Sequence, residues 1–350
     1  MAFHAGVLRF LAERNAMERV SNISSVSGGS LLVGLLMHQN QNQWPSSDQY
    51  KNILHIQLRK ILTTTSLEAG MLQEFKRLSN WKFALSRANV LARAIENIWG
   101  IRSTLDDLPA SPSWSINATT AETGKRFRFK GSELQDWVLG STRARGFPLS
   151  DAMAVSAAFP GLIGPYVLNS SAYTWDLPIY GVTEDTRPAQ ERFKKIHLYD
   201  GGVYDNLGLE AFFDAGRGPK PGMDGTIVVS DAGAPLPTGF DLGRFNIFRL
   251  KHVADIMSDQ VRSLRVRGLV AHALKAPGNA AYLRIGSTAN EFAKQFSITC
   301  PDGTWMTKEQ AAVASTFPTR LIRLTEENFD TLERHGYEAA AIGSLAFHFV

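Results

Sequence analysis

The chain contains very little cysteine, with Cys300 as the only one among 350 residues. A single thiol excludes an internal disulfide and a cysteine-based zinc site, so the sequence neither demands nor excludes an oxidising compartment. Long apolar runs are also missing, because the longest, from Leu31 to Met37, is far too short to cross a bilayer. The N-terminus lacks the charged and apolar regions of a signal peptide. We expect a cytoplasmic protein that can still lie peripherally on a membrane.

A strong net charge and several ligand-binding motifs are absent too. The formal net charge is only +4, and no basic stripe is interleaved with aromatic residues, which excludes a typical nucleic-acid partner. There is no H-E-x-x-H motif, no cluster of histidines and carboxylates, and no glycine-rich phosphate loop. The sequence therefore predicts neither a metal nor a cofactor. Its 44% hydrophobic content is sufficient for a large globular core.

A sharp junction occurs in "ISSVSGGSLLVGLLMH", residues 23 to 38, where a predicted strand over 20–26 meets a predicted helix. Ser27 lies at this corner within the pattern S-x-S-x-G, in which Ser25 replaces the first glycine of the nucleophile elbow G-x-S-x-G. Gly28 and Gly29 provide room for a strained turn, and the helix dipole favours an oxyanion nearby. The alternative is a glycine-rich turn in which Ser24, Ser27 or Ser30 caps the helix.

Two further predicted strands each end in a carboxylate. "KKIHLYDGG" ends at Asp200 and "GTIVVSDAG" at Asp231, so either aspartate is a candidate general base for Ser27. By itself, the sequence D-G-G is more typical of an ordinary turn than of a catalytic site. Because predicted strands alternate with predicted helices, the pattern favours an α/β fold with a mostly parallel sheet that is covered on both faces.

Residues 51 to 102 differ from the rest of the chain in charge and pattern. They carry nine Lys or Arg and three Asp or Glu, a local net charge of +6, and apolar residues recur at helical spacing. The simplest interpretation is an inserted helical layer with a solvated charged face. The alternative is a cap or interfacial surface, whose basic residues meet anionic head groups while Trp81 and Trp99 anchor nearby.

Three motifs in order, "SSVSGGS", "SAAFPGL" and "DGGVYDNLG", resemble those of the patatin-like phospholipase family. A late segment, "PTRLIRLTEENFDTLERHGYEAA", is similar to the helical tail of such proteins. The resemblance covers most of the chain and is weakest over residues 40 to 110. It implies a three-layer α/β/α sandwich, here a single domain over 1–350 with a basic helical insertion at about 45–105.

The resemblance also implies a lipid acyl hydrolase that needs no cofactor and no histidine. Its nucleophile corresponds to Ser27 and its base to Asp200, in preference to Asp231. The resemblance implies an elbow formed by Gly28 and Gly29. It assigns a supporting role to three residues of the third motif, Gly201, Gly202 and Asn206. Ser27 then attacks an ester carbonyl of a lipid, and the reaction passes through an acyl-enzyme.

The sequence departs from the family pattern at two places. Gly208 stands where the family usually has proline, and Met1 comes after the position of the family's oxyanion loop, G-G-G-x-[RK]-G. A catalytically impaired protein that binds lipids or a partner is therefore an alternative, since each oxyanion donor typically contributes 10²- to 10³-fold to the rate. A Ser-His-Asp esterase is a further alternative because eight histidines are present.

Overall fold

The computed structural model describes residues 1–83, 86–160, 163–178, 186–189, 193–236, 238–240, 246 and 248–350. These residues form two compact units. The first unit comprises Met1, Asn15–Gly208 and Arg320–Glu326, and the second comprises Ala2–Arg14, Leu209–Thr319 and Glu327–Val350. Among the described residues, no helix is both long enough and apolar enough to cross a membrane.

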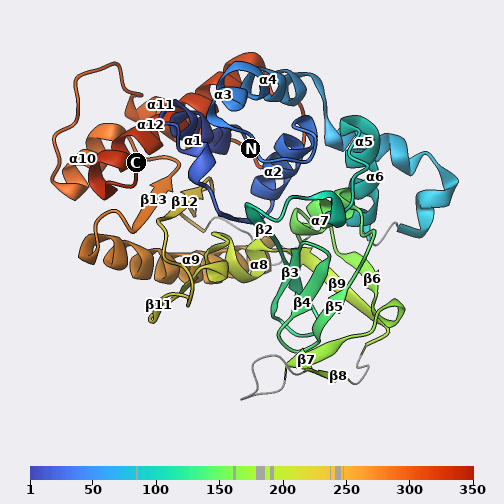
Figure 1. Cartoon of the computed structure of the whole chain (residues 1–350). Coiled ribbons are helices and arrows are strands. Elements are labelled where there is room, and N and C mark those ends of the chain that lie inside the picture. Colours follow the sequence, from blue (N-terminus) through green and yellow to red (C-terminus); the bar gives the residue numbers. More distant parts are fainter. Residues whose placement is uncertain are drawn as a thin grey trace. The chain divides into compact units, whose positions relative to one another are not determined.

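The first unit contains a large curled sheet and the helices that pack on it (Figure 1). Its helices are α2 (Gly28–Gln39), α3 (Ser47–Gln49), α4 (His55–Thr64), α5 (Leu67–Phe75), α6 (Arg87–Trp99), α7 (Leu149–Ser156) and α8 (Gly202–Asp205), with short turns η1 (Met17–Arg19), η2 (Tyr50–Leu54), η3 (Leu78–Phe83), η4 (Leu105–Asp107) and η5 (Ser170–Ala172). Its strands are β1 (Asn22–Ser25), β2 (Ser113–Thr120), β3 (Arg126–Lys130), β4 (Glu133–Asp136), β5 (Gly140–Arg143), β6 (Tyr166–Asn169), β7 (Asp176–Pro178), β8 (Thr186–Pro188) and β9 (Lys195–Asp200).

The strand directions in this sheet contradict the expected three-layer sandwich with a mostly parallel sheet. The strand order is β6-β9-β2-β3-β4-β5-β7-β8, and every pairing along it is antiparallel. Only β1, which pairs with β2 beside this path, is parallel to its neighbour within the described sheet. The physical reason is the length of the connections. Short turns join β2 to β3, β3 to β4 and β4 to β5, and a short turn can only reverse the chain.

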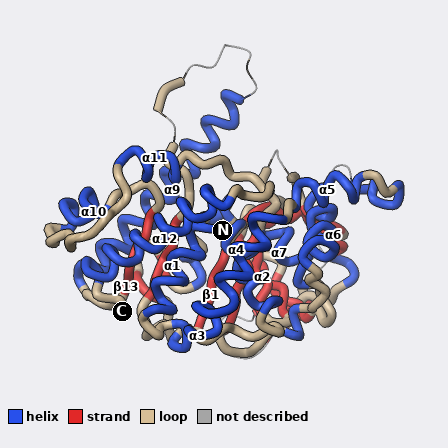
Figure 2. The backbone as a smooth tube through the Cα atoms, turned by 90° about the horizontal axis from the view of Figure 1, so that it is seen from above, coloured by secondary structure: helices blue, strands red, loops and turns tan. Residues whose placement is uncertain are grey.

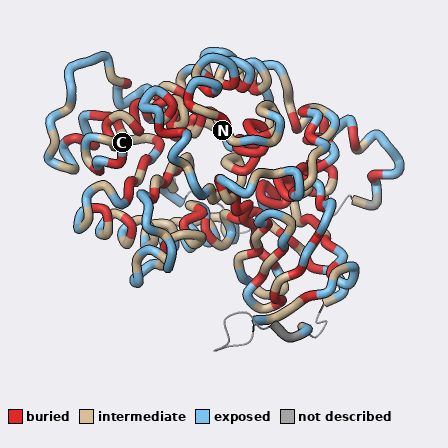
Figure 3. The backbone as a smooth tube through the Cα atoms, viewed as in Figure 1, coloured by how far each residue is buried: buried red, intermediate tan, exposed pale blue. Residues whose placement is uncertain are grey.

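The order of elements around the junction at residues 20–40 is as the sequence predicts, with β1 followed directly by α2. Helix α2 is buried on most sides, since Leu31, Leu35 and Leu36 have no exposed surface. It packs against α7, which in turn packs on β2 and β9. Figure 3 shows these segments among the buried parts of the chain. The helix that follows the corner between β1 and α2 is therefore fixed by packing against α7.

The second unit is built from helices around a separate two-stranded sheet. Its elements are α1 (Ala2–Glu13), η6 (Leu209–Ala211), β10 (Phe213–Asp214), β11 (Gly218–Pro219), β12 (Ile227–Asp231), α9 (Phe248–Lys275), β13 (Ala280–Arg284), α10 (Ala289–Phe296), α11 (Lys308–Ser315) and α12 (Glu326–Phe347). Strands β12 and β13 are parallel and are connected through α9. Parallel pairing thus occurs where a helix connects the strands, as the crossover rule requires.

Helices α1 and α12 lie side by side in this unit (Figure 2) and approach each other through two glycines. A Cβ atom on Gly336 would lie 1.8 Å from the carbonyl oxygen of Phe3, and one on Gly6 would lie 1.8 Å from that of Glu333. Both clashes are with backbone, which cannot rotate away as a side chain can. Contact between the two helices therefore depends on glycine at both positions.

We expect Gly336→Ala to destabilise the second unit by about 3 kcal/mol, the upper end of ordinary overpacking costs, because the two helices must separate. The change should lower the midpoint of urea unfolding monitored by circular dichroism. Gly225→Ala is the matched control, since a Cβ atom there would meet nothing within 4 Å. Equal midpoints for the two variants would show that α1 and α12 can separate without cost.

Candidate active site

Ser27 lies in a strained backbone conformation at the corner between β1 and α2. Its φ and ψ are 52° and −125°, a combination that is rare for any residue other than glycine. Its N–H donates to the carbonyl oxygen of Ser156 at 3.0 Å, and its own carbonyl accepts the N–H groups of Ser30 and Leu31. Ser27 occupies the N-cap position of α2, yet its hydroxyl makes no capping hydrogen bond. The Ser27 hydroxyl is therefore not used to cap the helix.

Asp200 is the last residue of β9 and is only 2% exposed. Its N–H donates to the carbonyl of Ala158 at 3.0 Å, and its carbonyl accepts the hydroxyl of Thr119 at 2.9 Å. The carboxylate oxygen Oδ1 accepts the N–H of Gly202 at 2.7 Å. Backbone and side chain are thus fixed on several sides.

The Asp200 carboxyl faces Ser27 and has an unusual pKa. Burial raises its pKa to about 6, against smaller lowering effects of hydrogen bonds from the Gly202 N–H and the Ser27 hydroxyl. Its second oxygen, Oδ2, is buried and has no partner at standard hydrogen-bond geometry. No hydrogen bond of standard geometry therefore joins this oxygen to the Ser27 hydroxyl, although the hydroxyl is close enough to lower the pKa of Asp200. A carboxylate in this state can accept the proton of a serine near neutral pH.

Ser156, the last residue of α7, hydrogen-bonds both to the corner at Ser27 and to Gly201, which follows β9. Its carbonyl oxygen accepts the N–H of Ser27 at 3.0 Å and that of Gly201 at 3.4 Å. Its hydroxyl donates to the carbonyl of Asn117 on β2 at 2.7 Å. One peptide group therefore sets the spacing between the Ser27 corner and the end of β9. Ser156 begins the motif "SAAFPGL", which is the one sequence signal for this role, although the motif alone does not identify its partners. Residues 161 and 162 of that motif lie outside the described residues.

The chain matches a model of the patatin-like phospholipase family over residues 1–213, more than half of its length. It belongs to that family. No curated protein sequence matches the chain.

Solved structures that are similar to this patatin-like protein include two of a human enzyme. One is human GIVD cytosolic phospholipase A2, at 14% identity with a TM-score of 0.53 over 99% of this chain and 57% of that one. The other is the same human enzyme in complex with methyl gamma-linolenyl fluorophosphonate inhibitor and terbium chloride, at 13% identity with a TM-score of 0.50 over 99% of this chain and 56% of that one. At such identities the likeness concerns the fold. The chain spans little more than half the length of these structures.

The two glycines after Ser27 in this patatin-like protein differ in whether their backbone N–H groups have a hydrogen-bond acceptor. The N–H of Gly29 donates to the carbonyl of Val26 at 2.9 Å. No acceptor among the described residues takes the N–H of Gly28, the first residue of α2. Of the two glycines that the sequence points to, Gly28 thus has the amide that can donate to an oxyanion.

The glycines of the D-G-G motif allow a close approach of backbone to the site. A Cβ atom on Gly201 would lie 2.6 Å from the carbonyl oxygen of Asn117. A Cβ atom on Gly202 would lie 2.7 Å from the side-chain oxygen of Asn206, the C-cap of α8. Gly208 has a φ of 63°, which proline cannot adopt, and this explains the departure from the family pattern.

Ser25, where the elbow motif has glycine, belongs to a buried chain of hydroxyl groups beneath the corner. Its hydroxyl accepts the indole N–H of Trp114 at 2.8 Å and shares a hydrogen bond with Ser30 at 2.8 Å. The hydroxyl of Ser30 in turn lies 2.7 Å from that of Ser156. Serine at position 25 therefore satisfies a buried tryptophan, a function that glycine could not provide.

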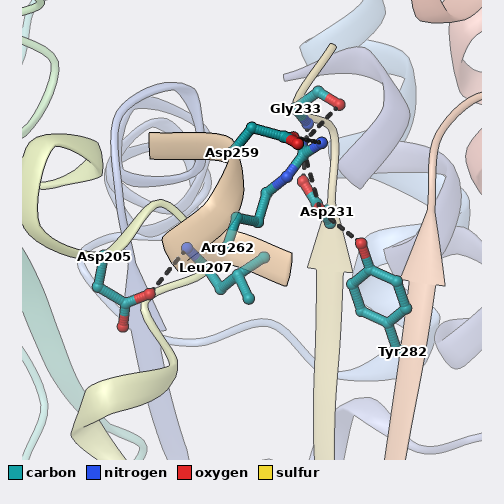
Figure 4. A network of polar contacts seen from close by, with 7 residues as sticks. All are labelled: Asp205, Leu207, Asp231, Gly233, Asp259, Arg262 and Tyr282. Carbon is teal, nitrogen blue, oxygen red and sulfur yellow. Dashed lines mark hydrogen bonds and ion pairs between the residues drawn. The ribbon is translucent and has the colours of Figure 1, made fainter. Parts of the chain in front are cut away.

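Asp231, the rival base, lies at the end of β12 in the second unit with its carboxylate fully engaged (Figure 4). Its oxygens accept the N–H of Gly233 at 2.8 Å and the hydroxyl of Tyr282 at 2.7 Å. Arg262 adds an ion pair at 3.7 Å. Because two hydrogen bonds and an ion pair already engage this carboxylate, the contacts of Asp231 fit a structural role.

The contacts of the described histidines differ from those expected of a base for Ser27. No described histidine hydrogen-bonds to Ser27, and two of them are engaged within the second unit. His4 lies 2.7 Å from the hydroxyl of Ser230, and burial lowers its pKa to about 3. His335 accepts the N–H of Gly286 at 2.7 Å, and burial lowers its pKa to about 4. These contacts favour neutral, structural histidines over a Ser-His-Asp arrangement.

Proposed function

We propose that this chain is a lipid acyl hydrolase that acts through a dyad of Ser27 and Asp200. The observation that carries the proposal is the pairing of a strained serine at a helix N-terminus with a buried carboxyl whose pKa burial raises to about 6. Membership of the patatin-like phospholipase family implies a lipid substrate. The N–H of Gly28, which has no acceptor among the described residues, lies at the same corner.

The proposed reaction has two steps that balance in protons. The hydroxyl oxygen of Ser27 attacks the ester carbonyl while Asp200 accepts the serine proton, and the Gly28 N–H donates to the developing oxyanion. The tetrahedral intermediate collapses to an acyl-enzyme, and Asp200 returns the proton to the departing alcohol. Water then attacks the acyl group and gives a proton to Asp200, which passes it back to Ser27 as the fatty acid leaves.

A fluorophosphonate ester tests this proposal directly, since the human enzyme of similar fold is described in complex with such an inhibitor. We expect Ser27 to displace fluoride and form one covalent adduct, which intact-mass analysis detects and peptide mapping places on Ser27. Hydrolysis of a medium-chain p-nitrophenyl ester and of phospholipid vesicles should accompany labelling. A folded protein that takes no label and cleaves neither substrate would favour the lipid- or partner-binding alternative.

The pH dependence of hydrolysis should report the pKa of Asp200. Only the carboxylate form can accept the serine proton, and burial raises that pKa to about 6. We therefore expect kcat/KM on a neutral ester to fall about tenfold per pH unit well below pH 6 and to level off above about pH 7. An inflection near pH 4, the value of an ordinary aspartate, would show that the base is a different or an exposed carboxyl.

We further propose that the end of α5 and the following η3 contact an anionic membrane. Leu72, Leu78 and Trp81 are 67%, 74% and 62% exposed, and Lys76 and Arg77 lie between them in the sequence. Apolar side chains beside basic ones are typical of interfacial segments. Trp99, in contrast, is buried and donates its indole N–H to Thr65 at 3.1 Å, so it is not an anchor.

Replacing both Leu78 and Trp81 with serine should reduce binding to vesicles of mixed phosphatidylcholine and phosphatidylserine about tenfold in a sedimentation assay. Trp137→Ser is the matched control, because Trp137 in the same unit is 69% exposed and lies outside this segment. Binding that is insensitive to anionic lipid content and to salt would contradict the proposed surface.

A further inference from the structure

A cavity of the first unit lies at the opposite end of α7 from Ser156. Its volume is about 340 Å³, and it is bounded by α6, the first turn of α7 and β6. Asp151 and Ser156 are five residues apart on α7, which places them about 8 Å apart along the helix. The residues that characterise the cavity are Phe83, Arg93, Glu96, Ser150, Asp151 and Tyr166. None of them has a role in the proposed hydrolysis.

Two charged side chains of this cavity lack a close ionic partner. Neither Arg93 nor Glu96 forms an ion pair or a hydrogen bond with its side chain among the described residues, and the Arg93 guanidinium lies 5.7 Å from the ring centre of Phe83. By contrast, Glu74 on the neighbouring helix α5 binds Arg77, Asn80 and Asn97. A few charged groups that line a cavity can fix the orientation of a ligand.

The lining of the cavity also carries a carboxyl, Asp151, and a phenol, Tyr166. Burial raises the pKa of Asp151 to about 6, while Arg93 lowers it and Glu96 raises it through their charges. Burial also raises the pKa of Tyr166, and the nearby charge of Asp151 raises it further. Desolvation thus disfavours the ionised form of this carboxyl. A bound ammonium group would compensate, because an opposite charge nearby stabilises a carboxylate.

We propose that this cavity binds a small zwitterion that carries a phosphate and an ammonium group, as in phosphocholine. Arg93 is suited to the phosphate, which a guanidinium binds through charge-assisted hydrogen bonds. Glu96 and Asp151 are suited to the ammonium group, and the rings of Phe83 and Tyr166 offer faces for cation–π contact with it. The choice of a lipid-derived zwitterion rests on the proposed function, whereas binding itself requires nothing of Ser27.

Charge and size together favour this class of ligand. A simple anion would meet the two carboxyl groups of Glu96 and Asp151, and a simple cation would meet the charge of the Arg93 guanidinium. A zwitterion can place its negative group near Arg93 and its positive group near the two carboxyl groups. The volume of about 340 Å³ is at the small end of ligand pockets, and its charged lining suits a head group and not an acyl chain.

Isothermal titration of the Ser27→Ala protein with phosphocholine, choline, inorganic phosphate and glycine betaine tests the site. We expect phosphocholine to bind at least tenfold more tightly than choline or phosphate alone, and more tightly than the carboxylate zwitterion glycine betaine. Arg93→Gln and Glu96→Gln should each weaken it about tenfold, a loss of about 1.4 kcal/mol. Arg87→Gln on the same helix is the control and should bind normally, and circular dichroism confirms that each variant is folded.

Two results would overturn the proposal: no heat from phosphocholine at roughly 10 mM, or affinities that Arg93→Gln and Glu96→Gln leave unchanged. Monomeric short-chain phosphatidylcholine identifies the source of the ligand. Binding of that lipid through the same two residues supports a lipid head group, and binding of phosphocholine alone supports the free compound. Fluorophosphonate labelling of Ser27 is measured separately, so loss of head-group binding with labelling intact refutes this site and leaves the hydrolase proposal standing.

Discussion

Replacing Ser27 with alanine is expected to reduce kcat for ester hydrolysis by about 10⁴-fold or more, because removal of a nucleophile abolishes the acyl-enzyme route. The folded protein should be nearly unaffected. The Ser27 hydroxyl makes no capping hydrogen bond to α2, so its loss avoids the cost of about 1 kcal/mol that usually follows removal of an N-cap. Initial rates with a p-nitrophenyl ester and urea unfolding curves measure the two quantities separately.

Ser24→Ala is the matched control for this variant, three residues earlier in the same stretch. Its hydroxyl donates to the carbonyl of Gly208 at 2.6 Å and accepts an N–H from Asn117 at 2.9 Å. Its loss should lower stability by about 1 kcal/mol while the rate stays within about tenfold of the original. If Ser24→Ala lost activity and Ser27→Ala kept it, the nucleophile would have been assigned to the wrong serine.

The local parts of the candidate site are predictable from sequence because local chemistry determines them. Gly28 and Gly29 mark the corner after β1, and Gly201 and Gly202 mark the end of β9. Glycines at these positions indicate that the backbone is strained or closely packed there. That Ser27 and Asp200 face each other follows only from the family resemblance, since nothing in the spacing distinguishes Asp200 from Asp231.

The direction of the strands is not predictable in the same way. Apolar patterning identifies a strand but carries no information on which neighbour it pairs with. The alternation of strands and helices at the two ends of the chain does not extend to its middle. Between Ser113 and Arg143 four strands instead follow one another with no helix among them, and that interval builds the antiparallel part of the sheet.

Contacts between distant segments also escape prediction from the sequence. The carbonyl of Ser156 binds amides from the Ser27 corner and from Gly201, residues that are 129 and 45 positions away. Such a contact uses a backbone oxygen, which every residue possesses, so the residue type alone does not identify its partners. The role of Ser25 is hidden for a similar reason, because its partner Trp114 lies on β2.

Replacing Asp200 with asparagine is expected to reduce kcat by about 10³-fold or more, since the amide cannot accept the serine proton. The substitution keeps the shape and the oxygen that accepts the Gly202 N–H at 2.7 Å. It also removes a buried carboxyl that is costly to ionise, so stability at pH 8 should be equal or greater. For a carboxyl whose folded pKa is raised, the unfavourable contribution appears as pH rises above the unfolded value.

Asp205→Asn is the matched control for Asp200→Asn, because Asp205 is buried in the same turn and its Oδ1 accepts the N–H of Leu207 at 3.1 Å (Figure 4). An amide oxygen can accept that bond too, so this variant should keep its rate within about tenfold. The double variant Ser27→Ala, Asp200→Asn decides whether the two residues act together. In a dyad the second change costs almost nothing once the first is made, because neither residue retains a function without the other. Losses that multiply would show that Ser27 and Asp200 contribute independently, and the base for Ser27 would then have to be another group.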